Sequence, residues 1–108
     1  MFATRRLLQS TRITLFTRET CGLCSQAKGV LSDVWDKRPF AYTEVNVDLP
    51  KPESKQWRDL YDFDVPVIHI SKATAAEEDP AKVGKAIKLM HRFTVEQVEA
   101  HMDKAEQS

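Results

Sequence analysis

The stretch that decides the fold is ITLFTRETCGLC, residues 13–24. Its first five residues, Ile13 to Thr17, are typical of a buried β-strand, and it ends in the only two cysteines of the chain. Apolar residues then recur at three- and four-residue spacing from Gly22 to Lys37, which predicts an amphipathic helix with its apolar face on a sheet. Two thiols three positions apart at a strand-to-helix junction indicate dithiol redox chemistry.

The helix start gives the two thiols different properties. A helix that begins at Cys21 directs its unpaired amide groups and the positive end of its dipole at that sulfur, which favours the reactive thiolate. Arg18, three positions earlier, adds positive charge. Cys24 lies about one turn further on, close enough to form a small disulfide ring without unfolding the helix. We therefore expect Cys21 to be the exposed attacking thiol and Cys24 the more buried resolving thiol.

The rest of the chain predicts three more strands and two more helices. The strands are expected at 40–47, 65–71 and 86–91, a short helix near 53–61, and a last helix capped by Thr94. Residues 72–85 show no strand period and are interpreted as a solvated loop. The order β-α-β-α-β-β-α predicts an α/β fold, in which a four-stranded mixed sheet is flanked by helices.

Composition and charge exclude several functions. The 108 residues fit one domain, and 16 basic residues balance 16 acidic ones without a long basic block, so nucleic-acid binding is not expected. No apolar run approaches the ~20 residues that cross a bilayer, so we expect a soluble protein without membrane association. Two cysteines are too few for a secreted disulfide scaffold, so an intracellular protein is expected. One C-x-x-C pair supplies only two of the usual four zinc ligands, so no metal site is expected.

The N-terminal segment, residues 1–12, has its own character. It carries three arginines and hydroxyl residues but no acid, which is typical of a short mitochondrial presequence. The alternative interpretation is a frayed basic terminus in front of the first strand. Cytoplasmic and mitochondrial locations both stay open.

A second motif, Asp64-Val65-Pro66-Val67-Ile68, opens the third predicted strand. Together with TRETCGLC it resembles the thioredoxin fold in its short, three-layer glutaredoxin form, over about residues 13–106. Within that superfamily the chain is most similar to glutaredoxin-like proteins with a Cys-Gly-Leu-Cys motif. The resemblance implies that Cys21 attacks a disulfide, that Cys24 resolves the mixed disulfide, and that a cis Pro66 faces them.

The resemblance also implies contacts with glutathione. Arg18 has the spacing of the family's basic residue for a glutathione carboxylate, and the backbone of Val65 would bind the glutathione cysteine. The family usually has Thr where this chain has Asp64, and we expect this charge to repel anionic glutathione. A Gly-Gly pair that binds the γ-glutamyl end is replaced by His91-Arg92-Phe93-Thr94, in which Thr94 alone imitates part of that contact.

These observations lead to one main hypothesis and two alternatives. The main hypothesis is a monomeric thiol-disulfide oxidoreductase that exchanges electrons with protein disulfides or glutathione through Cys21 and Cys24. It would need no bound cofactor, with glutathione as a co-substrate or a thioredoxin-type system as reductant. The first alternative is an iron-sulfur cluster carrier in which Cys21 thiolates of two subunits bind a cluster with glutathione. The second is a thioredoxin-like binding module without catalysis.

Overall fold

The computed structural model describes residues 10–107, apart from the side chain of Lys85. Its order of elements confirms the predicted α/β fold. The elements are β1 (Thr11–Thr17), α1 (Gly22–Lys37), β2 (Ala41–Asn46), α2 (Pro52–Tyr61), β3 (Val67–Lys72), the 3-10 helix η2 (Pro80–Lys85), β4 (Ile87–Met90) and α3 (Val95–Glu106). The four strands form one mixed sheet in the order β2-β1-β3-β4, with β1 parallel to β2 and antiparallel to β3, and β3 antiparallel to β4.

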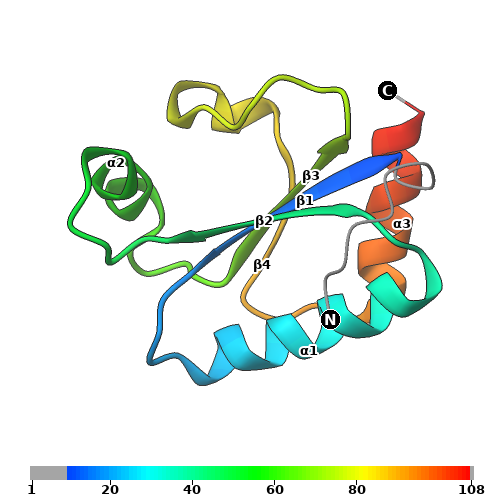
Figure 1. Cartoon of the computed structure of the whole chain (residues 1–108), viewed down its shortest axis with the longest axis horizontal. Helices are drawn as coiled ribbons and strands as arrows, with labels where there is room; N and C mark the ends of the chain where they lie inside the picture. Colours follow the sequence, from blue (N-terminus) through cyan, green and yellow to red (C-terminus); the bar gives the residue numbers. More distant parts are fainter. Residues whose placement is uncertain (1–9, 108) are drawn as a thin grey trace.

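Helices cover both faces of this sheet. Figure 1 shows α1 and α3 on one side of the strands and α2 on the other, with η2 above the sheet near α2. Side chains alternate along β1, so that Ile13 and Leu15 pack in the cluster with α1 and α3, whereas Phe16 packs with Trp57 and Tyr61 of α2. The sheet therefore separates two hydrophobic cores, as in a three-layer fold.

The first strand begins two residues before the predicted Ile13. Thr11 and Arg12 pair with Lys72 and Ser71 of β3, so Arg12 belongs to the sheet and not to a separate basic segment. Its guanidinium donates hydrogen bonds to the carbonyl oxygens of Ala75 and Ala76, at 3.1 and 2.7 Å. The rest of the predicted N-terminal segment, residues 1–9, lies outside the described residues.

The interpretation of residues 72–85 as a solvated loop is wrong in part. Lys72 ends β3, and η2 covers Pro80–Lys85. The Asp79 side chain accepts a hydrogen bond from the backbone N–H of Ala81 at 2.9 Å, and Pro80 occupies the first turn, so a short helix starts here without any apolar period. Val83 then packs against the α2-side core.

The helix boundaries follow local signals. The range of α1 is the predicted one, and α3 begins with the predicted capping box, in which the Thr94 hydroxyl accepts from the Gln97 N–H at 3.2 Å and the Gln97 side chain accepts from the Thr94 N–H at 2.9 Å. No helix within residues 10–107 is long and apolar enough to span a bilayer.

Candidate active site

Strand register brings four connecting segments to one end of the sheet, where β1, β2 and β4 finish and β3 begins. Phe16 near the end of β1 pairs with Val67 at the start of β3, and Val67 pairs with Met90 at the end of β4. Thr17 likewise pairs with Asn46 at the end of β2. The four segments that leave or enter these strand ends contain Cys21, Asp48, the Asp64–Pro66 motif and His91. In Figure 1 the start of α1, the segment between α2 and β3 and the end of β4 all lie at this end of the molecule.

Cys21 is the N-cap residue of α1. Its backbone is extended (φ −145°, ψ 112°), and its Sγ accepts a hydrogen bond from the backbone N–H of Cys24 at 3.1 Å. The sulfur thus occupies the position where unpaired helix amides and the helix dipole favour negative charge. Both thiols are free, and Cys21 is partly exposed whereas Cys24 is only 2% exposed.

The surroundings of Cys24 keep its thiol protonated at neutral pH. Burial raises the pKa of Cys24 because it disfavours the thiolate, and the hydrogen bond with Cys21 acts in the same direction. Hydrogen bonds with the Thr17 side chain and the Arg18 backbone partly oppose this rise. A buried neutral thiol one helical turn from a partly exposed one is the arrangement that an attacking and a resolving cysteine require.

Arg18 is bound by two carboxylates. Its Nη2 lies 2.7 Å from Asp62 Oδ1, and its Nε lies 3.3 Å from Asp48 Oδ2. The pKa of Arg18 is raised chiefly by the hydrogen bond to Asp62, while Asp48 and Cys21 add smaller electrostatic contributions. Arg18 is thus near Cys21, but its charge is shared with two aspartates. Sequence analysis missed this role of Asp62, which lies 44 positions away and carries no motif.

Pro66 lies at the same edge, and the peptide bond between Val65 and Pro66 is cis, as the resemblance implies. The carbonyl oxygen of Pro66 accepts a hydrogen bond from the backbone N–H of His91 at 2.7 Å. His91 has a φ of 63°, which is uncommon for a residue other than glycine, and its Nε2 lies 3.7 Å from Asp64 Oδ1. Val65 is partly buried beside these contacts.

Thr94 has a structural function in this site. Because its hydroxyl and its N–H are both engaged in the α3 capping box, its side chain orders the helix start. The segment before it contributes to a small hollow of about 110 Å³ against α1, lined by Gln26, Ala27, Val30, His91, Arg92 and Phe93. The structure therefore brings Cys21, Cys24, Arg18, Val65 and Pro66 to one edge, with Thr94 at the start of the helix that follows it.

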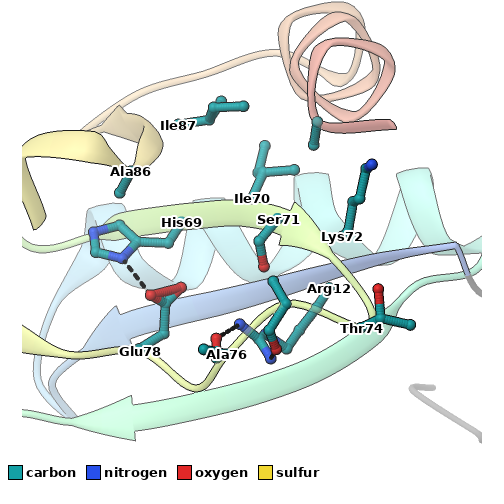
Figure 2. Close-up of a pocket in the computed structure, with 12 residues that line it drawn as sticks. Arg12, His69, Ile70, Ser71, Lys72, Thr74, Ala76, Glu78, Ala86 and Ile87 are labelled. Carbon is teal, nitrogen blue, oxygen red and sulfur yellow. Dashed lines mark hydrogen bonds and ion pairs between the residues drawn. The ribbon is translucent and has the colours of Figure 1, made fainter. Parts of the chain in front are cut away.

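A larger hollow of about 290 Å³ lies at the other end of β3, toward Ser71 and Lys72 (Figure 2). His69, at its edge, is 1% exposed, and its Nδ1 lies 3.3 Å from the Glu78 carboxylate. The other ring nitrogen lies 2.7 Å from the Tyr61 hydroxyl. His69 is therefore a packed core residue, and the hollow contains neither cysteine in its lining.

A dithiol at the start of a helix, beside a cis-proline on a mixed four-stranded sheet with helices on both faces, defines a protein of the thioredoxin fold. Residues 12–103 match the family model of the glutaredoxin-like domain (DUF836). The chain therefore belongs to this glutaredoxin-like family.

Solved structures agree with the fold. A structural-genomics target protein from X. campestris, XcR50, is 24% identical with a TM-score of 0.53, over 86% of this chain and 97% of that chain. Thioredoxin O2 from Arabidopsis thaliana, in its oxidised state, is 16% identical with a TM-score of 0.59, over 89% of this chain and 75% of that chain. At these identities the likeness concerns the fold alone.

Proposed function

We propose that this protein is a dithiol thiol-disulfide oxidoreductase with Cys21 as the attacking and Cys24 as the resolving thiol. The observation that carries the proposal is the hydrogen bond of 3.1 Å from the Cys24 N–H to the Cys21 sulfur at the first turn of α1. This hydrogen bond stabilises negative charge on the sulfur of Cys21, the more exposed thiol. Burial raises the pKa of Cys24 and so favours the neutral form of the second thiol before the mixed disulfide forms.

The exchange takes two steps. The Cys21 thiolate attacks one sulfur of a disulfide, so that a mixed disulfide forms and the first substrate thiolate leaves. Cys24 then loses its proton and its thiolate attacks the Cys21 sulfur, which forms the Cys21–Cys24 disulfide and releases the second substrate thiolate. Two electrons pass from the protein to the substrate. An external dithiol, or two molecules of glutathione, must reduce the protein again.

The Asp64–Pro66 segment supports the proposal because it lies at the same end of the sheet as the segment that leads from β1 to the thiols. The backbone of Val65 lies just before β3, where a substrate segment adding as a short strand would find main-chain partners. The positive charge of Arg18 near Cys21 is offset by the carboxylates of Asp48 and Asp62, with which it pairs.

The test is reduction of insulin disulfides with dithiothreitol as electron donor, for the natural protein and Cys21→Ser. We expect Cys21→Ser to lose turnover, because serine is a poor nucleophile toward sulfur. Cys24→Ser is first reduced, then freed of dithiothreitol and mixed with insulin, and it is expected to accumulate a mixed disulfide, visible by mass spectrometry as the mass of the substrate added at Cys21. Full turnover by Cys21→Ser, with an unchanged urea unfolding midpoint, would refute the assignment. Parallel assays with glutathione and with thioredoxin reductase identify the reductant.

A further inference from the structure

The segments around Cys21 contain more acidic than basic residues. The four segments at this end of the sheet contain four acidic residues, Glu19, Asp48, Asp62 and Asp64. Within the described residues, the lysines and arginines of these segments are Arg18, Lys51 and Arg92. The cation nearest to Cys21 in the sequence is Arg18, and it is paired with two of the four carboxylates. A ligand at the sulfur thus finds no uncommitted cation in the connection between β1 and α1.

A hollow with two carboxylates adjoins the segment that leads into Cys21. It has a volume of about 210 Å³ and is lined by Glu19, Thr20, Asn46, Asp48 and Leu49. Glu19 and Thr20 immediately precede the attacking cysteine, and the Glu19 and Asp48 side chains are exposed. The hollow has room for the end of a lysine or arginine side chain, whose positive charge Glu19 attracts, since Asp48 is already paired with Arg18.

The segment before Pro66 lies at the same end of the sheet. Phe63 is 93% exposed, which is uncommon for a large apolar side chain, and it stands between Asp62 and Asp64. Asp64 is 42% exposed on its side chain, and its neighbour His91 adds positive charge only when protonated. An apolar contact flanked by carboxylates is complementary to a basic polypeptide rather than to a small anion.

We infer that the Cys21 site prefers polypeptide disulfides with lysine or arginine next to the sulfur, and discriminates against anionic disulfides such as oxidised glutathione. This inference rests on the proposed function, of which it names the substrate class. Glu19 and Asp64 are the residues that set the charge preference, and Phe63 supplies the apolar contact to the polypeptide.

The experiment measures single-turnover rates of the reduced protein with symmetrical disulfides of different charge. The probes are two short peptides of the same sequence apart from lysine or glutamate beside the cysteine, with hydroxyethyl disulfide as a neutral reference. At low ionic strength we expect the lysine peptide to react about tenfold faster than the glutamate peptide, because the two differ by two unit charges and each unit charge about 6 Å away in water changes a rate about threefold. The ratio should shrink in 0.5 M salt, since the Debye length is then only about 4 Å.

Variants identify the responsible residues. Glu19→Gln and Asp64→Asn should each lower the lysine-to-glutamate ratio by about threefold. Asp33→Asn is the matched control, because it removes the same charge from an exposed position of α1, roughly 18 Å along the helix from Cys21 at 1.5 Å per residue. Phe63→Ser should lower the rates of both peptides relative to hydroxyethyl disulfide by about threefold.

The possible results separate the two claims. Equal rates for the two peptides, or an equal change of the ratio in Asp33→Asn, would overturn the charge preference and leave the dithiol function intact. If none of the three disulfides reacts with the reduced protein, the proposed function itself fails, and the preference fails with it.

Discussion

The hydroxyl of Tyr61 lies 2.7 Å from Nε2 of His69, with both side chains buried between α2 and the sheet. The other nitrogen of the same ring lies 3.3 Å from the Glu78 carboxylate. One imidazole therefore connects three segments, namely α2, β3 and the connection before η2. This polar contact lies among the rings of Phe16 and Trp57, where water does not replace a lost partner.

We expect Tyr61→Phe to lower the free energy of unfolding by about 1–3 kcal/mol, because it leaves the buried Nε2 of His69 without its partner. Urea unfolding followed by tryptophan fluorescence measures the change. Tyr42→Phe is the matched control, since the hydrogen bond from Tyr42 to Glu44 is exposed and water can replace it. Equal losses in the two variants would contradict a special contribution of the Tyr61–His69 contact.

The two phenylalanines at 16 and 63 should differ sharply in their effect on stability. Phe16 is fully buried, with its ring centroid 4.4 Å from that of Trp57, and Phe16→Ala is expected to cost about 3–5 kcal/mol through lost contacts and a cavity. Phe63→Ala removes a side chain that is 93% exposed and should change stability by less than about 0.5 kcal/mol. Thermal unfolding of both variants checks this. A large loss in Phe63→Ala would mean that Phe63 packs within the fold.

Both tyrosines should ionise at higher pH in the folded protein than in the unfolded chain. Burial raises the pKa of Tyr61 to about 12, and burial together with Glu44 raises the pKa of Tyr42 as well. Absorbance at 295 nm should show little phenolate at pH 10 in buffer, whereas in 8 M urea half of the phenolate signal should be present near the ordinary value of about 10.

The same shifts set the direction of the effect on stability. Between about pH 10 and pH 12 the folded state retains the phenolic proton of Tyr61 while the unfolded state loses it, so the free energy of unfolding falls as pH rises. Urea unfolding at pH 9, 10 and 11 measures this slope. A stability that rises over that range would show that the phenolates are stabilised by the fold, contrary to the burial argument.

Thr94→Ala should lower the free energy of unfolding by about 1 kcal/mol, because it removes the hydroxyl that caps α3. Thr94→Ser retains this oxygen and should restore most of the loss. Calorimetric melting of the two variants separates the cap from the side-chain methyl group. Equal melting temperatures for Thr94→Ala and the natural protein would show that the capping box contributes nothing to stability.

Signals within a few residues of each other predicted most of the fold. The range of α1 follows from apolar residues at helical spacing, and the start of α3 follows from Thr94 and Gln97, because both patterns act through contacts one helical turn apart. The junction at Cys21 could be predicted for the same reason. Residues 80–85 were interpreted wrongly because a 3-10 helix of one or two turns carries no apolar period, and only Asp79 and Pro80 mark its start.

Contacts between distant residues could not be predicted in this way. The role of Asp62 depends on the pairing of β1 with β3, which brings the end of α2 to Arg18 across 44 positions. The interactions of Arg12 with Ala75 and Ala76 likewise depend on where the connection after β3 lies over the sheet. No local pattern encodes either contact.

The sequence by itself determined the order of the elements and the position of both thiols at the start of a helix, because periodicity, capping and the C-x-x-C spacing act over a few residues. The family was indicated by the resemblance of its two motifs to glutaredoxin-like proteins. Only the tertiary structure decided that Arg18 is paired with Asp48 and Asp62, that His69 joins Tyr61 to Glu78, and that Phe63 is exposed. These properties arise when the sheet brings distant segments together, so that burial and charge at each residue depend on neighbours from other parts of the chain.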